Sequence, residues 1–177
     1  MRRSLVLLLA GVLIFCLSSL ATAATVGTVT ALPANVNSDG SVRTVTITWT
    51  GDPSTGGVSG WVTDNITVPT SFCRSGAIFG TANCTLTEAI RGYWPLVVET
   101  KPGTTTPTSY GATFTDSLGL DLFLGKITGM STSATQQTNI QANIPLAGPY
   151  TFALSGQTNV SATGTLVIWL LFAGGAQ

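Results

Sequence analysis

The feature that most constrains the fold of this chain is an alternation of apolar and hydroxylated residues with a period of two. In residues 44–49, Val45, Ile47 and Trp49 are separated by threonines, and residues 150–154 repeat the alternation with aromatic and aliphatic residues. Neighbouring side chains on a β-strand point to opposite faces of the sheet. The alternation therefore predicts strands with one buried face, which places Trp49 in the core.

Other segments show the same alternation or the residues typical of loops. Residues 120–124 alternate too, so we expect a strand there. Stretches rich in Gly, Pro, Ser and Thr at 51–57 and 101–109 predict loops, and the one segment that suits a helical turn is Leu86 to Arg91. Many short strands with such turns and no long helix predict an all-β, two-sheet β-sandwich, in a single domain over residues 24–177.

The last apolar segment, residues 166–172, is apolar on both faces, so both faces need to be covered. It is too short to cross a bilayer as a helix. Two interpretations are open. The segment is either a central strand of the sandwich, which also places Trp169 in the core, or a strand whose outer face or edge is covered by another copy of the protein.

Residues 1–23 have the layout of a secretory signal peptide. Two arginines precede an apolar run from Leu5 to Leu20, and Ala21-Thr22-Ala23 forms a small-residue cleavage site. Cleavage there would leave a chain that begins at Ala24 and has no membrane anchor. We therefore expect a secreted protein that is extracellular or located at the cell surface.

Charge argues against two classes of partner. Charged residues make up 8% of the chain and the net charge is zero, whereas about 25% is typical of soluble proteins. Two of the seven basic residues lie in the signal peptide, so no basic stripe is left for nucleic acid or for an acidic membrane. The low charge also leaves little repulsion between copies of the molecule.

Enzyme chemistry has little support in the sequence. The chain has no histidine, which removes the most common general base and zinc ligand. Carboxylate pairs such as Asp116 with Asp121, or Glu88 with Glu99, could be nominated for glycoside hydrolysis. Their surroundings favour solvated loop and strand-edge positions instead. We expect neither an enzyme nor a cofactor.

The cysteines fit an oxidising compartment. Cys16 lies within the signal peptide, so Cys73 and Cys84 are left as a pair, for which we predict a disulfide.

Residues 35–40 resemble the start of an EF-hand calcium loop, but the twelfth position is Thr46 rather than a glutamate. Turn chemistry explains the Asn, Asp and Gly of this loop, so we expect no metal site.

Two groups of residues are candidates for surface chemistry. Three Asn-x-Ser/Thr sequons, at Asn65, Asn83 and Asn159, are candidate glycosylation sites if the source organism glycosylates secreted proteins. Trp61 and Trp94 each follow a glycine-containing loop, from which an aromatic ring could stack on a sugar or anchor a partner. Burial of these two rings is the alternative.

Residues 28–33, the turn at Ser38-Asp39-Gly40 and residues 42–49 resemble the first two strands of an immunoglobulin-like domain. Secretion, a single all-β domain, few charges, one disulfide and a strongly apolar last strand resemble the pilin-like, immunoglobulin-fold subunits of extracellular filaments. The resemblance implies that an N-terminal segment, here residues 24–32, completes the fold of a neighbouring subunit by strand addition.

We therefore expect a structural subunit of an extracellular filament or surface layer, whose partners are other copies of itself. Strand pairing between copies would supply directional backbone hydrogen bonds. The expected contact residues are Val26, Val29 and Leu32 on the donor strand, and Leu166, Ile168 and Leu170 on the acceptor. The alternative function is a secreted module that binds surface glycans or another surface ligand through Trp61 and Trp94.

Overall fold

The computed structural model describes residues 26–73, 83–142 and 144–172. The expected signal peptide, residues 1–23, and the next two residues lie outside the described residues. The described chain consists mainly of antiparallel β-strands in several sheets, with one α-helix and one disulfide. The prediction of an all-β fold with a disulfide is therefore confirmed.

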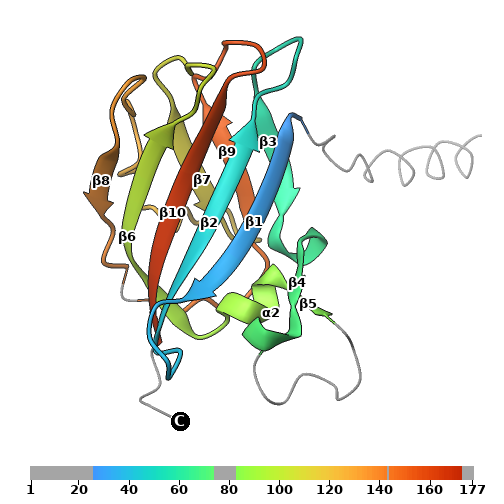
Figure 1. Cartoon of the computed structure of the whole chain (residues 1–177), viewed down its shortest axis with the longest axis vertical. Helices are drawn as coiled ribbons and strands as arrows, with labels where there is room; N and C mark the ends of the chain where they lie inside the picture. Colours follow the sequence, from blue (N-terminus) through green and yellow to red (C-terminus); the bar gives the residue numbers. More distant parts are fainter. Residues whose placement is uncertain (1–25, 74–82, 143, 173–177) are drawn as a thin grey trace, which may run out of the picture.

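Two sheets form the body of the molecule and a small third sheet lies at one end (Figure 1). The five-stranded sheet contains, in spatial order, β1 (Thr28–Asn35), β2 (Val42–Thr50), β10 (Thr163–Phe172), β6 (Tyr93–Pro102) and β8 (Gln136–Asn139). The three-stranded sheet contains β3 (Val58–Val62), β9 (Thr151–Ser155) and β7 (Gly111–Thr115). The two-stranded sheet pairs β4 (Thr67–Pro69) with β5 (Asn83–Thr85).

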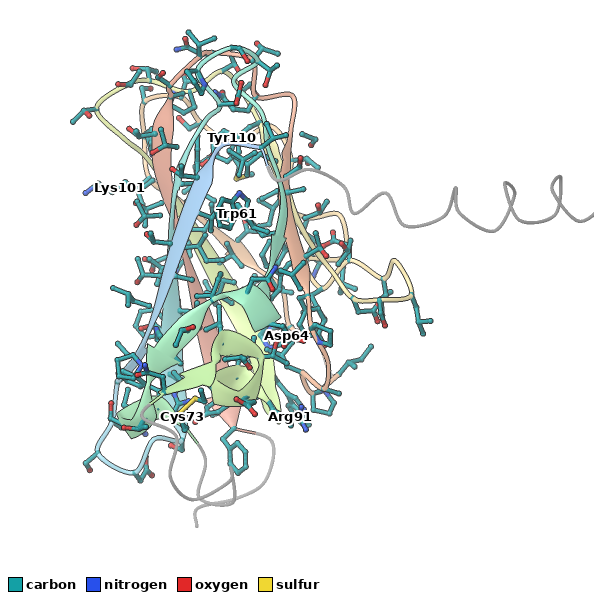
Figure 2. The ribbon with its side chains drawn as sticks, turned by 90° about the vertical axis from the view of Figure 1, so that its right-hand side faces the viewer. Trp61, Asp64, Cys73, Arg91, Lys101 and Tyr110 are labelled. Atoms are coloured by element: carbon teal, nitrogen blue, oxygen red, sulfur yellow. A yellow bond between two sulfur atoms is a disulfide. The ribbon has the colours of Figure 1, made fainter. Side chains whose placement is uncertain are left out.

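The core lies between the five-stranded and the three-stranded sheet, which Figure 2 shows edge-on. Trp49 of β2 is fully buried, and its ring meets the ring of Tyr110 edge-to-face with 5.3 Å between centroids. Phe114 of β7 stacks on Tyr150 at 5.2 Å. Both sheets thus contribute aromatic side chains to one core, and the prediction that Trp49 is buried is confirmed.

Strand β2 follows the alternation from which it was predicted. Val45, Ile47 and Trp49 are at most 1% exposed, whereas the intervening threonines lie on the opposite face. The large Trp49 ring fits because its partner on β10 is Gly164, where a Cβ atom would overlap the indole. One bulky residue is therefore accommodated by a glycine on the adjacent strand.

The last strand, β10, is central in its sheet. It pairs antiparallel with β2 along one edge and with β6 along the other, and the ladder with β6 has a bulge between Trp169 and Leu170. Its backbone edges are both occupied within the domain. This confirms the first of the two interpretations of residues 166–172 as far as the strand position is concerned.

The expected strand at residues 120–124 does not form, and that prediction is wrong. The Asp121 carboxylate instead accepts hydrogen bonds from the backbone N–H groups of Phe114 (3.0 Å), Phe123 (3.1 Å) and Gly125 (2.9 Å). Backbone donors that bond to a side chain are not available for a strand ladder. The leucine alternation therefore belongs to a series of turns after β7.

The predicted helical turn is present as α2 (Leu86–Ile90), and a capping box starts it. The Thr85 hydroxyl accepts from the Glu88 N–H at 3.3 Å, and the Glu88 carboxylate accepts from the Thr85 N–H at 2.9 Å. Helix α2 belongs to a small unit that we call the disulfide lobe. This lobe consists of η1 (Thr63–Asn65), β4, η2 (Thr70–Phe72), Cys73, β5 and α2.

Candidate functional site

Three of the four carboxylates nominated for catalysis bind backbone groups of their own turn or helix end, and the fourth, Glu99 on β6, accepts a hydrogen bond from Gln137. Asp116 accepts hydrogen bonds from the N–H groups of Leu118 and Leu120, both at 2.9 Å, while Asp121 binds the three donors described above. Glu88 caps α2. In the part of the chain that the structure describes, no three His, Cys, Asp or Glu side chains gather as metal ligands. These contacts explain the first three carboxylates as stabilisers of turns and of a helix end.

No helix within residues 26–73, 83–142 or 144–172 has the length and apolar character needed to cross a membrane.

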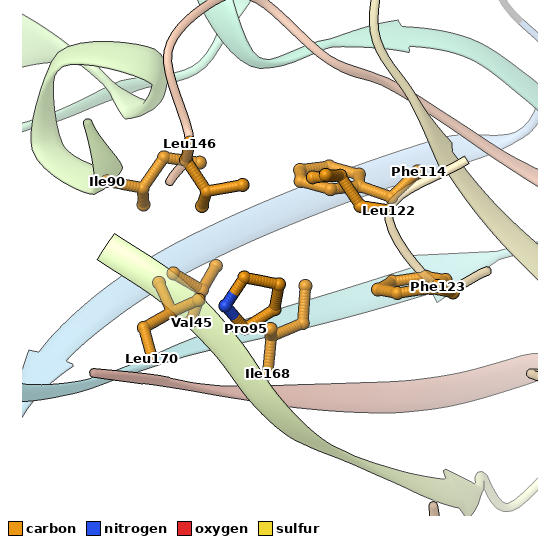
Figure 3. Close-up of a pocket in the computed structure, with 9 residues that line it drawn as sticks. All are labelled: Val45, Ile90, Pro95, Phe114, Leu122, Phe123, Leu146, Ile168 and Leu170. Atoms are coloured by element: carbon orange, nitrogen blue, oxygen red, sulfur yellow. The ribbon is translucent and has the colours of Figure 1, made fainter. Parts of the chain in front are cut away.

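A cavity between the two larger sheets is too small to be a ligand site (Figure 3). Its lining is apolar and comes from both layers, with Val45 and Ile168 on one side and Phe114 on the other. Its volume is about 10 Å³, which is about the minimum that one water molecule needs, and water also needs polar partners. We interpret this space as a packing gap in the core.

The turn that resembles a calcium loop uses its oxygen atoms for hydrogen bonds. Asn35 Oδ1 accepts from Arg43 Nε at 2.9 Å, and Asn37 Oδ1 accepts from the first backbone N–H of β2 at 2.9 Å. Asp39 Oδ1 accepts from the Ser41 N–H at 3.0 Å, and this contact with Ser41 lowers the pKa of the Asp39 carboxyl. The turn is thus closed by its own side chains.

The predicted disulfide joins Cys73 to Cys84, with 5.9 Å between their Cα atoms. Cys73 follows η2, and Cys84 is the middle residue of β5, so the bond closes the disulfide lobe (Figure 2). The lobe therefore has a covalent closure in addition to the short ladder between β4 and β5.

A buried arginine that was not predicted from the sequence attaches the disulfide lobe to the five-stranded sheet. Arg43 of β2 is only 5% exposed, and its guanidinium donates to the carbonyl oxygens of Phe72, at 2.9 Å, and of Ala89. It also lies over the Tyr93 ring, 4.9 Å from the centroid. The sequence does contain a sign of its burial, because Arg43 stands two residues before Val45 and therefore on the inward face of the same strand.

The structure places the expected donor residues as follows. Val26 forms a bridge with Ser59, and its carbonyl oxygen accepts from Trp61 Nε1 at 3.3 Å. Val29 is buried in the core of its own domain, whereas Leu32 is 63% exposed on the opposite face of β1. Strand β1 pairs along its whole length with β2 of the same copy. The place beside β2 is thus filled by a strand of the same copy.

The expected acceptor residues are Leu166, Ile168 and Leu170, which are at most 3% exposed and belong to the core. Strands β2 and β6 occupy both edges of β10. The arrangement therefore leaves no place beside β10 for an added strand, because the edges of this sheet are those of β1 and β8.

The face of the five-stranded sheet that points away from the core carries a group of apolar side chains. Strand alternation puts every second residue of each strand on this face. The register places Trp169 between Thr44 and Val97, and Leu171 between Val42 and Trp94. We call this surface the outer face, and its apolar members are Leu32, Val42, Trp94, Val97, Val167, Trp169 and Leu171.

Trp169 therefore does not lie in the core, and the expectation that it does is wrong. It is half-buried on the outer face, because its neighbours Ile168 and Leu170 are the residues of β10 that point inward. Among the described residues, the indole N–H groups of Trp94 and Trp169 have no hydrogen-bond partner and are shielded from solvent. What these two rings expose is carbon.

The two tryptophans nominated for ligand binding do not form one platform. Trp61 lies on β3 of the three-stranded sheet, is partly buried against the core and donates its N–H to Val26. Trp94 lies on β6 of the five-stranded sheet, on the outer face. The aromatic neighbour of Trp94 on that face is Trp169, diagonally across the β6–β10 ladder.

All three sequon asparagines are exposed. Asn65 is the last residue of η1, and Asn83 begins β5 next to the disulfide. Asn159 lies in the turn before β10, where its amide donates to the carbonyl oxygen of Thr106. Each side chain has the exposure that glycosylation requires, and whether it is modified stays a prediction.

Two large pKa shifts have structural causes away from the outer face. The Ser54 hydroxyl and the N–H groups of Ser54 and Thr55 lower the pKa of exposed Asp52 to about 2. Burial raises the pKa of Tyr110 to about 12, with a smaller opposing effect from Thr100. The first shift reflects a tightly closed turn and the second an aromatic residue of the core.

No family model, curated protein or solved structure matches the chain. The class of protein is thus defined by the fold and its surfaces: an antiparallel, disulfide-containing β-domain with an apolar outer face.

Proposed function

We propose that the protein is a secreted structural subunit of an extracellular filament or surface layer, in which copies are joined by exchange of β1. The observation that carries this proposal is the position of β1. It is the first described strand, lies at the edge of the larger sheet and forms a ladder only with β2. Its inward residues Val29 and Ala31 fill the core beside β2.

An N-terminal edge strand can be exchanged between identical domains without loss of any contact. A single connection, residues 36–41, links β1 to the rest of the domain. If this connection opens, β1 of one copy can take the place beside β2 of the next copy. The acceptor in this proposal is therefore β2, with Ile47 and Trp49 next to the exchanged strand, and not β10.

Secretion is supported by the disulfide, which an oxidising compartment maintains, together with the signal-peptide layout of residues 1–23. Low charge supports assembly, because like charges that repeat along a polymer repel one another. The chain has seven acidic and seven basic residues in total.

We also propose that the domain is an immunoglobulin-like sandwich. In support, β1 and β2 form an antiparallel pair at the edge of one sheet, and β3 then crosses to the other sheet, as the first three strands of such domains do. The central position of the last strand, β10, is a departure from the usual strand order, so the proposal covers the layer arrangement and the first three strands.

The first experiment is negative-stain electron microscopy of the protein isolated from the surface of its own cells, with unheated SDS gels alongside. We expect regular filaments or a layer, and an SDS-resistant ladder. A monodisperse monomer at high concentration would overturn the structural-subunit proposal.

A cysteine pair then tests the exchange itself. Thr30 and Thr48 face each other across the β1–β2 ladder on the exposed side. Opposed residues of an antiparallel pair lie within the Cα distance of a disulfide. In the double variant Thr30→Cys/Thr48→Cys, exchange would link each copy to the next, and a denaturing, non-reducing gel would show a covalent ladder.

The matched control is Thr48→Cys/Thr165→Cys, because Thr165 opposes Thr48 across the β2–β10 ladder, which stays within one copy. This control should run as a monomer under the same conditions. If the Thr30→Cys/Thr48→Cys variant also runs as a monomer while filaments are visible, strand exchange is wrong and assembly uses another contact.

A further inference from the structure

We propose that the outer face of the five-stranded sheet packs against the same face of a second copy, with Trp169 and Trp94 at the centre of the contact. This contact does not depend on the exchange of β1, because the outer face consists of side chains that point away from the core. It would join two complete domains face to face.

The composition of the outer face resembles that of an interface centre. Strand β10 contributes Val167, Trp169 and Leu171, all half-buried, in place of the threonines that β2 places on the same face. Tryptophan is the residue most enriched at energetic centres of interfaces. Thr44 and Thr46 of β2 border these residues on one side. Glu99 and Lys101 of β6 lie on the other side, so both rows contribute to the polar rim that such contacts have.

The size of the face is sufficient for a stable contact. Five strands, spaced about 4.8 Å apart, give a width of about 24 Å. The four longest strands have eight to ten residues each, which gives a length of at least about 25 Å. One copy would therefore bury roughly 600 Å², and two copies about 1,200 Å², which is the lower limit of standard protein interfaces. The twist of two sheets allows such faces to stack with their strands nearly aligned.

The charges of the outer face favour a second copy as the occupant. On the described strands of this sheet, the charged side chains that point outward are Glu99 and Lys101, two residues apart on β6. Gln137 of β8 donates to Glu99 at 3.3 Å. Two identical faces would thus bring two acids and two bases together, a balanced set that can pair across the contact. A strongly charged partner would meet no excess of opposite charge on this face.

The orientation of the two indoles favours an apolar occupant over a sugar. Recognition of sugars combines aromatic stacking with hydrogen bonds from nearby polar groups. The N–H groups of Trp94 and Trp169 are covered by neighbouring atoms within the described chain, so they are not available as donors. Their exposed carbon surface, with Val97 and Leu171 beside it, suits contact with an identical apolar surface.

The test is sedimentation equilibrium of the processed protein, purified from its own secretion, and of two variants. Val167→Thr/Trp169→Thr removes the centre of the outer face and keeps β-branched residues that suit a strand. Leu118→Thr is the matched control, because Leu118 is 92% exposed in a turn outside the sheet. Circular dichroism and thermal unfolding establish that each variant is folded.

We expect a concentration-dependent dimer or higher species for the wild type and for Leu118→Thr. The dissociation constant of Val167→Thr/Trp169→Thr should rise about 30-fold or more, as is typical for loss of an interface hot spot. Unchanged association of the folded double variant would overturn the proposal. A monomeric wild type whose tryptophan emission shifts on addition of soluble glycans would also overturn it, and would identify the face as a sugar-binding surface.

The cysteine experiment separates this proposal from the exchange of β1. A covalent ladder that persists in the Val167→Thr/Trp169→Thr background means that exchange occurs without the face contact. A dimer that is sensitive to Trp169 but yields no ladder means that the face contact exists and strand exchange does not.

Discussion

Gly164 shows how a single residue can determine whether two strands fit together. It lies opposite Trp49, and a Cβ atom at this position would overlap the indole of a ring that is fully buried. Because the ring is enclosed by both sheets, it has little room to move away.

We therefore predict that Gly164→Ala lowers the free energy of unfolding by about 1–3 kcal/mol, the usual cost of overpacking a core. Urea denaturation followed by tryptophan fluorescence measures the change. The control is Gly148→Ala, since apart from its chain neighbours no atom lies within 4 Å of a Cβ at that position, and its φ lies outside the left-handed region. Equal stability of the two variants would show that the Trp49 site has room to spare.

Tyr110 is a second single residue with a testable effect, because its burial makes the stability of the protein depend on pH. Burial raises its pKa from the usual 10.0 to about 12 in the folded state. Between these values the unfolded chain releases the phenolic proton and the folded chain keeps it, so the folded state binds more protons. The contribution of Tyr110 to stability is therefore complete below pH 10 and is lost as the pH rises toward 12.

The measurement is the free energy of unfolding of the wild type and of Tyr110→Phe between pH 9 and pH 12. We expect the wild type to lose more stability than Tyr110→Phe across this range. The Tyr110 hydroxyl is buried and the effect of its contact with Thr100 is small, so Tyr110→Phe should be about as stable as the wild type at neutral pH. Parallel pH curves would contradict the burial of this hydroxyl.

At the scale of elements, the disulfide lobe depends on a few contacts. Its ladder has only three residues in each strand, and its attachment to the five-stranded sheet includes the Arg43 hydrogen bonds. The disulfide spans a sequence separation of 11 residues. Closing a loop of this length constrains the unfolded chain by about 3 kcal/mol in the loop-entropy description.

We predict that Cys73→Ser/Cys84→Ser destabilises the protein by about 3 kcal/mol or, if the lobe opens separately, by less in global unfolding. Hydrogen exchange should then show the largest loss of protection in β4, β5 and α2, with the ladders of β2 and β10 least affected. Addition of a reductant should reproduce this pattern in the wild type and leave the serine variant unchanged. Uniform loss of protection would show that the lobe and the sheets unfold together.

Elements could be predicted from sequence where a local rule decides them. The alternation of Val45, Ile47 and Trp49 is sufficient for β2, because the period of the pattern specifies which face is buried. The same rule was wrong at residues 120–124, since Asp121 takes up three backbone donors and a carboxylate in the middle of a run gives no sign of how many amides it will bind. Hydrogen bonding by one side chain outweighed the period of its neighbours.

The order of the strands in the whole molecule was harder to predict from the sequence. An apolar pattern says that a strand is buried but does not name its neighbours, so the placement of β10 between β2 and β6 could not be read from residues 163–172. The outer face had a partial signal, because residues 166–172 are apolar on both sides. That signal predicted an uncovered or shared surface but could not say that Trp169, rather than Ile168, would point outward, because this depends on the register with both neighbours.

The central place of β10 also has a consequence for the order of events during folding. Of the described strands, β10 is synthesised last, yet it is the strand that joins the β1–β2 pair to the β6–β8 pair. Until the final residues are available, the larger sheet consists of two separate halves with unpaired edges. If the chain is exported as proposed above, the larger sheet stays open during transit and closes only once β10 has emerged.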